Sequence, residues 1–215
     1  MPDTSRPVIG IIGGTGDLGS GLAKAWAAAG YEVIIGSRTR DKAEAFAAGL
    51  GGSVKGRDNI GAAEAADIVV LAVPFASHDT TLEEIRPALQ GKILVDAVVP
   101  LVPPKVSVVQ LPEGGSAAQA AQRILGDAVR VVSAFHTVGA SKLHTGGRAD
   151  CDVLVFSDDR QARDAVIDLA GVVANRGVGG GALANSAAAE ALTSVLIWIN
   201  RTYKISGAGI AITGL

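Results

Sequence analysis

The sequence predicts an α/β fold: a Rossmann-type, doubly wound and mainly parallel sheet with a small C-terminal helical lobe. Along the 215 residues, apolar runs alternate with alanine-rich stretches of helical period. The runs are apolar at successive positions, which is typical of strands in a sheet covered by helices on both faces. The first run is followed by "GGTGDLGSGL" at Gly13–Leu22, where dinucleotide-binding folds carry their phosphate loop.

In the first half of the chain, strands are expected at the apolar runs and helices at the stretches of longer period. Glycines after the first two helices are stop signals, and Pro87 limits the end of the fourth. The expected elements, in order, are strand Val8–Ile12, helix Leu18–Ala29, strand Tyr31–Gly36, helix Asp41–Leu50, helix Ile60–Ala66, strand Asp67–Val73, helix Ser77–Leu89 and strand Lys92–Asp96.

The second half begins with an irregular stretch, Ala97–Gly115, which holds four of the eight prolines. Ser116 and Gln119 have the spacing of a capping box at a helix start. The glycines of Gly177–Gly181 indicate a flexible link, and the apolar residues 192, 195, 196, 199 and 203 define one face of the last helix. The expected elements are helix Ser116–Leu125, strand Val129–Ala134, strand Asp152–Phe156, helix Arg160–Ala174 and helix Asn185–Tyr203.

Charge and composition argue against several classes of function. The net charge of -2, with scattered lysines and arginines, leaves no basic surface for nucleic acid or a membrane. The single cysteine, Cys151, allows no intrachain disulfide and fits a reducing compartment. The start "MPDTSRP" lacks a signal-peptide pattern, and the longest apolar stretch, Ala187–Ile199, is too short to span a bilayer. We therefore expect a soluble cytoplasmic protein, and no metal site.

The glycine-rich stretch contains the spacing of a dinucleotide fingerprint at Gly14, Gly16 and Gly19. In such a loop the first glycine permits the tight turn, the second lets a pyrophosphate approach the backbone, and the third lets helix and strand pack closely. Free amides at the helix start then face the anion. The alternative is a glycine-rich turn that binds nothing, since this spacing alone is weak evidence.

The end of the second strand favours NADP over NAD. A carboxylate in this place binds the ribose hydroxyls of NAD, whereas here the chain reads Ser37-Arg38. A guanidinium can pair with a 2′-phosphate, and a serine hydroxyl can donate to it. Arg40 and Lys42 stand close by at the next helix start and would add positive charge. The alternative is that Arg38 is a solvated surface residue.

Five blocks of the sequence together resemble the F420-dependent NADP oxidoreductases. They are "GGTGDLGSGLA", "GSRTRDKAE", "AVPF", "SAFHTVGA" and "NSAAAEALTSVLIWINRTYK", in this order along nearly the whole chain. The resemblance implies an enzyme that transfers a hydride between NADP(H) and the deazaflavin coenzyme F420 as co-substrate. It also implies a Rossmann-type NADP-binding domain at residues 1–157, a small lobe at residues 158–215, and a homodimer.

The resemblance also assigns residues to the two ligands. For the NADP side it implies Thr15, Gly16, Asp17 and Leu18 at the pyrophosphate and ribose, Ser37, Arg38 and Lys42 at the 2′-phosphate, Val73, Pro74 and Phe75 at the adenosine side, and contacts from Val102 and Ala140. His136 and Val138 would lie against the reacting rings. His136 is the expected catalytic residue, which would orient the ring; the alternative is a structural histidine bonded to backbone.

The last helix departs from the family pattern. Archaeal members have an arginine and a serine at the positions of Ala187 and Ala191, whereas Thr193 is retained. These three positions are expected to face the second substrate. The two alanines favour an alternative, an NADP-dependent reductase of a flavin, an imine or a small carbonyl compound. The shortage of acid–base residues leaves a third reading, a non-catalytic NADPH-binding regulator.

Overall fold

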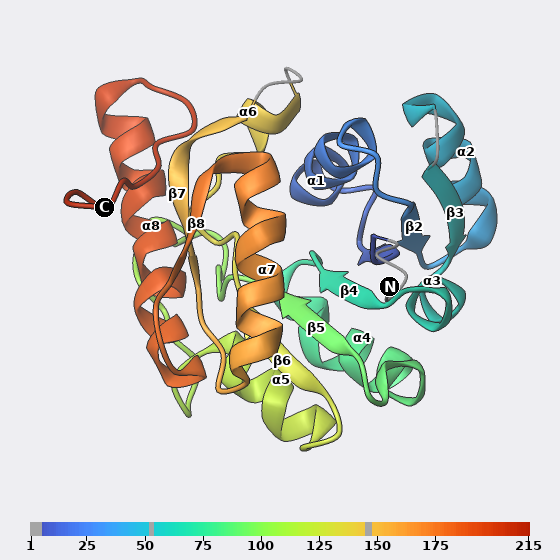
Figure 1. Cartoon of the computed structure of the whole chain (residues 1–215). Coiled ribbons are helices and arrows are strands. Elements are labelled where there is room, and N and C mark those ends of the chain that lie inside the picture. Colours follow the sequence, from blue (N-terminus) through green and yellow to red (C-terminus); the bar gives the residue numbers. More distant parts are fainter. Residues whose placement is uncertain (1–5, 52–53, 145–147) are drawn as a thin grey trace.

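The computed structural model describes residues 6–51, 54–144 and 148–215. A six-stranded parallel sheet, in the order β3-β2-β1-β4-β5-β6, has helices on both faces, and β7 and β8 form a second, two-stranded sheet (Figure 1). This confirms the predicted fold class. The strands are β1 (Ile9–Ile12), β2 (Val33–Ser37), β3 (Val54–Asp58), β4 (Ile68–Leu71), β5 (Ile93–Asp96), β6 (Arg130–Ser133), β7 (Ala149–Val155) and β8 (Ala174–Gly179). The helices are α1 (Asp17–Ala28), α2 (Arg40–Leu50), α3 (Asn59–Ala65), α4 (His78–Ile85), α5 (Ala117–Leu125), α6 (Ala140–His144), α7 (Arg160–Val173) and α8 (Ser186–Tyr203).

The strand order reverses direction between β1 and β4. β1 pairs in parallel with β2 on one side and with β4 on the other, and the remaining pairs of the main sheet are also parallel. The carboxyl ends of all six strands therefore meet at one edge of the sheet. In open α/β sheets this edge, at the point of reversal, is where ligands bind.

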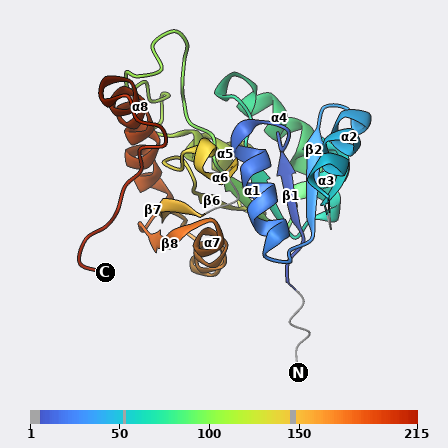
Figure 2. The ribbon, with the colours of Figure 1, turned by 90° about the horizontal axis from the view of Figure 1, so that it is seen from above.

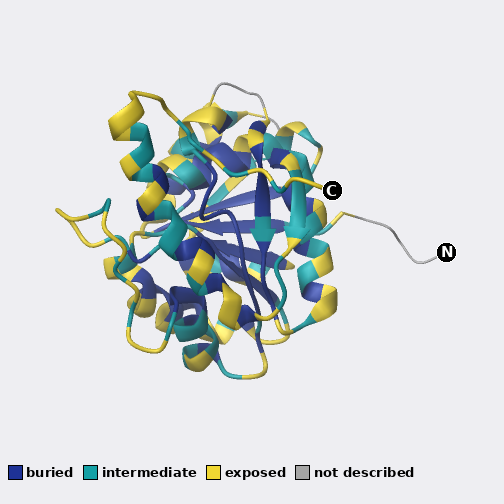
Figure 3. Ribbon diagram, turned by 90° about the vertical axis from the view of Figure 1, so that its left-hand side faces the viewer, coloured by how far each residue is buried: buried dark blue, intermediate teal, exposed yellow. Residues whose placement is uncertain are grey.

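Alternate residues of the strands enter two separate cores. Ile11 of β1 packs toward α1, α2 and α7, whereas its neighbour Ile12 packs toward α3, α4 and α5. Figure 3 shows the buried strands between helices whose exposed residues face outward. Burial of an isoleucine or leucine contributes about 2 kcal/mol relative to exposure. Packing on both faces therefore fixes the edge where the loops meet.

Most of the expected elements are present with ends displaced by a few residues. The helix predicted at Ser77–Leu89 is shorter, because α4 ends at Ile85 and a 3-10 turn, Arg86–Leu89, contains Pro87. The cap of α5 is confirmed: the Ser116 hydroxyl accepts the amide of Gln119 at 3.1 Å. The stretch from Ala97 to Gly115 contains no helix or strand, as expected.

Two strands and one short helix were not expected. The predicted flexible link at Gly177–Gly181 is wrong, because Ala174–Gly179 forms β8, which pairs in parallel with β7. A Cβ on Gly177 would lie 2.6 Å from the carbonyl oxygen of Ile167 in α7, so this glycine marks close packing instead of flexibility. β3 is the second unexpected strand, and its glycine also marks close packing: a Cβ on Gly56 would lie 2.3 Å from the backbone of α2. The third unexpected element is α6.

The last third of the chain forms a β7–α7–β8 unit that packs on the main fold. The predicted boundary at residue 157 separates β7 from its partner β8; the division into domains stays a prediction. Trp26 of α1 donates its indole N–H to the carbonyl of Leu169 in α7 at 3.1 Å, and Ser133 bridges to Phe156. Within the described ranges, no helix is both long and apolar enough to cross a membrane.

Candidate active site

The glycine-rich loop connects β1 to α1 at the carboxyl edge of the sheet. Gly13 has a φ of +79°, and a Cβ there would lie 2.5 Å from the carbonyl oxygen of Ala72, so only glycine fits beside β4. A Cβ on Gly19 would lie 2.8 Å from the loop backbone, so helix and loop touch at this glycine. α1 begins at Asp17, after Gly16, without a cap from any described side chain. Its first amides are therefore available to an anion.

A cavity of about 280 Å³ joins this loop to the end of β2. Ser37 is buried, whereas Arg38 and Lys42 are exposed. Arg38 makes no hydrogen bond or ion pair with any residue that the structure describes, so its guanidinium is free to bind an anion. The residues expected at the NADP site that line the cavity are Thr15, Gly16, Ser37, Arg38, Lys42, Val73 and Pro74.

The same cavity has polar residues that the sequence did not single out. Asn59, the first residue of α3, lines it together with Ser77 and Thr81. Asn59 is buried, and its Oδ1 atom has no hydrogen-bond partner among the described residues. A buried amide oxygen without a partner is costly in the free protein. It is therefore suited to a donor on a bound ligand.

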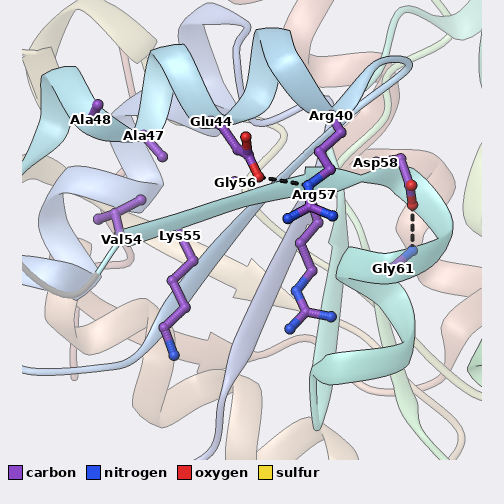
Figure 4. Close-up of a pocket in the computed structure, with 10 residues that line it drawn as sticks. All are labelled: Arg40, Glu44, Ala47, Ala48, Val54, Lys55, Gly56, Arg57, Asp58 and Gly61. Carbon is purple, nitrogen blue, oxygen red and sulfur yellow. Dashed lines mark hydrogen bonds and ion pairs between the residues drawn. The ribbon is translucent and has the colours of Figure 1, made fainter.

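Arg40 does not face this cavity, although the sequence places it close to Arg38. Its Nε donates to Glu44 at 2.6 Å within α2, and it lines a separate hollow of about 570 Å³ beside α2 and β3. Figure 4 shows this hollow at the outer edge of the sheet, with Arg40 directed at Glu44. The hollow is larger than the cavity at the glycine loop, but no residue of that loop or of α1 lines it. The smaller cavity is therefore the candidate dinucleotide site.

On the other side of the edge, the chain turns sharply after β6. Phe135 has a φ of +70°, a strained conformation for an aromatic residue. Its ring is fully buried and meets the ring of Trp26 edge to face, with centroids 5.7 Å apart. Such backbone strain costs about 1–3 kcal/mol and is held by surrounding packing, often at functional sites. The next residue, His136, lines a cavity beside this turn.

His136 is 6% exposed and has one free ring nitrogen. Its Nε2 lies 3.3 Å from the Ser133 hydroxyl, whereas Nδ1 has no partner among the residues described. Burial lowers the pKa of His136 to about 4, against the opposing charge of Asp96. The imidazole is therefore neutral near pH 7. It adds no positive charge to the site.

A second cavity, of about 110 Å³, lies between this turn and α8. His136 and Val138 line one side, and Thr193 and Asn200 of α8 line the other. The Thr193 hydroxyl donates to the carbonyl of His136 at 2.9 Å. Ala208, in the segment after α8, completes the lining. The structure thus brings together three of the residues expected at the second substrate.

α8 is also fixed to α5 through a buried carboxylate. Glu190 accepts the first two amides of α5, from Ala117 at 2.7 Å and from Ala118 at 3.2 Å. Burial raises the pKa of Glu190 to about 7, although both amides favour the ionised form. Ser186 adds a hydrogen bond to Ser116 at 2.7 Å. These contacts and Thr193 set the position of α8 against the turn after β6.

His78, which follows the "AVPF" block, forms a buried ion pair instead of lining a cavity. Its Nε2 lies 2.8 Å from Asp96 at the end of β5, and its Nδ1 lies 2.7 Å from Asp79. Burial would lower the pKa of His78, but the bonds to both carboxylates outweigh this and raise it to about 9. Asp96 also accepts the amide of Val98, which fixes the chain as it leaves the strand.

Some of the expected site residues line neither cavity. Asp17, Leu18, Gly14 and Gly19 belong to the loop and helix start beside the first cavity. The following lie apart from the lining of both: Phe75, half-buried at the start of the 3-10 turn Phe75–Ser77; Val102, exposed in the irregular stretch; Ala140, the first residue of α6; and Ala187 and Ala191, half-buried on α8. Their roles stay predictions.

Comparison with known proteins tests the resemblance directly. Residues 8–100 match the family model described as NADP oxidoreductase, coenzyme F420-dependent. The F420-dependent NADP reductase of Methanothermobacter marburgensis is 39% identical over 96% of this chain and 98% of its own length. The chain belongs to the family of coenzyme F420-dependent NADP oxidoreductases. This confirms the family predicted from the five sequence blocks.

Solved structures agree with this family assignment. A crystal structure of an Arthrobacter protein, assigned as an F420-dependent NADP reductase, matches with a TM-score of 0.81 and 26% identity, over 97% of this chain and all of that one. The pyrroline-5-carboxylate reductase of Coxiella burnetii matches with a TM-score of 0.63 at 18% identity, over 91% of this chain and 67% of that one. The second likeness shows the fold alone. In this F420-dependent oxidoreductase family member, the two cavities therefore occupy a fold shared with other reductases.

Proposed function

We propose that the protein transfers a hydride between NADP(H) and coenzyme F420. The observation that carries the proposal is a pair of cavities at the carboxyl edge of one sheet. One has free helix amides and unpaired cations, and the other is lined by a neutral histidine and apolar side chains. From β2 to β6 the sheet spans four strand spacings, about 19 Å. An extended dinucleotide laid across the strand ends can run from one cavity to the other.

The residues of the first cavity fit NADP in particular. The amides at the start of α1 suit the pyrophosphate, and the free Arg38 with Lys42 suits a 2′-phosphate. Ser37 occupies the place where NAD-binding sites carry an acidic residue. The unpaired Oδ1 of Asn59 suits a hydroxyl or amino donor of the adenosine half. Each group therefore has a chemically matched partner on this coenzyme.

The protein's part in the reaction is to bind, orient and exclude water. The two bound coenzymes supply the hydride donor and acceptor, and the chain provides proximity and geometry. His136 is neutral near pH 7, so it lines the second cavity without placing a positive charge beside the second ring. Thr193 holds the His136 backbone. The turn at Phe135, packed against Trp26, directly precedes His136.

The direct test is turnover of F420 by the purified protein. With NADPH and oxidised F420 mixed, we expect the absorbance of the oxidised deazaflavin to fall at the rate of NADPH consumption. Retained NADPH binding without any bleaching of F420 would contradict the proposal. Consumption of NADPH with a free flavin, imine or small carbonyl compound alone would support the alternative acceptor, which Ala187 and Ala191 favour. Binding of NADPH without turnover of any acceptor would support a regulator.

We also propose a cytoplasmic homodimer formed through α8. The predicted apolar face divides in the structure: Leu196 is buried in its own subunit, whereas Val195 is 42% and Trp198 52% exposed. Leu192 and Ile199 are half-buried on the same helix. Exposed apolar groups so close together favour a protein contact.

Sedimentation equilibrium tests the dimer. We expect twice the 21.6 kDa of the chain, and we expect Trp198→Lys to yield a folded monomer with a lower Tm, because it loses the stabilisation that association provides. A wild-type protein that stays monomeric at micromolar concentration would contradict the dimer. Cell fractionation tests the cytoplasmic location.

A further inference from the structure

The segment after α8 forms part of the second cavity. α8 ends at Tyr203, and Lys204 has a left-handed conformation with a φ of +54°. The chain then folds back: the amide of Ala208 bonds to the Asn200 side chain at 2.9 Å. Ala208 lines the cavity opposite His136. We call residues 205–215 the C-terminal tail; it leaves α8 and passes beside β7 (Figure 2).

The tail is pressed directly onto the turn that carries His136. A Cβ on Gly139 would lie 2.5 Å from the Cα atom of Gly207, so the two backbones touch with no space for a side chain. Gly139 is three residues from His136 and lines the same cavity. A displacement of the tail would therefore change the shape of the cavity and remove the support of this turn.

One ion pair, between the partly exposed Arg176 and the buried Asp152, holds the tail in place. Arg176 of β8 binds Asp152 of β7 through two parallel hydrogen bonds of 3.1 Å. The same guanidinium donates to the carbonyls of Ile212 at 2.7 Å and Leu215 at 2.8 Å. Asp152 is 2% exposed, and its carboxylate accepts the amide of Ile212 at 2.7 Å. Its own amide donates to the carbonyl of Ile210.

The charges of this pair are matched, and the pair is remote from the first cavity. The hydrogen bonds from Arg176 and from the Ile212 amide hold the pKa of Asp152 below its usual value. The pair lies on β7 and β8, which contribute no residue to the cavity at the glycine loop. A change at the pair can therefore act on the second cavity while the first keeps its shape.

We propose that Asp152 and Arg176 are positioning residues for the second substrate, because they fix the tail as one wall of its site. This inference rests on the proposed function, in which the flat deazaflavin ring of F420 lies against the turn that carries His136. The ion pair touches neither coenzyme; it acts through Ala208 and Gly207. Loss of the pair weakens binding of F420 and leaves NADPH binding unchanged.

The test compares Arg176→Met with Arg176→Lys and Arg160→Met. Arg160 is a matched control: it lies on α7 and pairs with Asp164 at 3.6 Å, both exposed. Arg176→Met should raise the KM for F420 about tenfold or more, since small misplacements at a site cost up to about a hundredfold. Arg176→Lys should recover part of this loss, and Arg160→Met should behave as wild type. The dissociation constant of NADPH, followed by its fluorescence, should stay within about twofold throughout.

A second variant separates tail position from folding of the lobe. Truncation after Gly209 keeps the Asp152–Arg176 pair but removes Ile210, Ile212 and Leu215, which the pair holds. It should raise the KM for F420 as much as Arg176→Met. The proposal is overturned if both variants keep the wild-type KM, or if the KM for F420 and the dissociation constant of NADPH rise together.

Hydrogen–deuterium exchange distinguishes this inference from the proposed function. Arg176→Met should exchange faster than wild type at residues 136–139, whichever acceptor the enzyme uses. Unchanged exchange there would overturn the positioning role. If wild type fails to bleach F420 while exchange still rises, then the proposed acceptor is wrong and the support of the cavity wall stands.

Discussion

The two halves of the ligand edge are built on different principles. The NADP half is formed by local sequence: the loop at Gly13–Gly19 and the open start of α1 present backbone amides, and Ser37 and Arg38 follow at the end of the next strand. The acceptor half is formed by side chains from distant segments, with His136, Thr193 and Ala208 brought together by tertiary contacts. Evolution can therefore change the acceptor by altering the second half while the first retains the coenzyme.

The largest effect is expected from Arg38→Ala, which tests the NADP half. Loss of a charge-assisted contact with the 2′-phosphate should raise the dissociation constant of NADPH about a hundredfold, corresponding to about 3 kcal/mol. NADH lacks this phosphate, so its binding should change by less than about twofold. Titration of intrinsic coenzyme fluorescence measures both constants.

Two nearby variants show whether the effect is specific. Arg40→Ala removes a guanidinium only two residues away, but one that is paired with Glu44 at the outer edge of the sheet (Figure 4). It should leave both constants unchanged. Asn59→Ala should weaken NADPH and NADH alike, by about fivefold. Equal losses of NADPH and NADH in Arg38→Ala would show that Arg38 does not bind the 2′-phosphate.

A smaller effect is expected from His136→Leu, which tests the acceptor half. Leucine removes both ring nitrogens, whereas asparagine would keep a polar group at the position of Nδ1, so kcat/KM for F420 should fall about tenfold in His136→Leu while NADPH binding is kept. His144→Leu, at an exposed position of α6, should have no effect. Because the pKa of His136 is about 4, its ionisation should produce no inflection in activity between pH 6 and 8. Wild-type kcat/KM in His136→Leu would remove this residue from the site.

The smallest expected effect concerns the buried pair of His78 and Asp96. The pKa of His78 is raised to about 9 in the folded protein, compared with 6.5 unfolded. Between these values the folded state holds more protons than the unfolded state. Its contribution to stability is therefore complete below pH 6.5 and is lost as pH rises through about 9.

Thermal unfolding measures this contribution. We expect wild-type Tm to fall by about 3 °C per pH unit between pH 7 and 9. His78→Gln should have a lower Tm than wild type at pH 7 and a smaller change of Tm with pH, whereas His144→Gln should have the Tm of wild type at each pH. A wild-type slope retained in His78→Gln would assign the pH dependence to another group.

The sequence was sufficient for the main sheet and the coenzyme loop because both depend on local patterns. Continuous apolar runs mark strands buried on both faces, and the glycine spacing precedes a helix. β3 and β8 were missed for the opposite reason. Both are poor in apolar residues, and their glycines, Gly56 and Gly177, lie where a helix packs too closely for a side chain. Such contact is invisible in a local window.

The acceptor half depends on contacts between residues far apart in the chain. "FHT" pointed to His136, but not to its free Nδ1 or to the neutral state that burial imposes. Asn59 was missed because it directly follows β3, which was not expected. Arg176 donates to the carbonyl of Leu215, 39 positions later in the chain, and no rule of sequence spacing predicts this contact.

The two tryptophans give this protein a pair of built-in optical probes. Trp26 is fully buried, touches Phe135 and bonds to α7, whereas Trp198 stands on the exposed side of α8. Red-shifted emission that iodide quenches should therefore come from Trp198, and blue-shifted emission from Trp26. In single-tryptophan variants, the fluorescence of Trp26 can report on packing next to the His136 turn, and the fluorescence of Trp198 can report on subunit association.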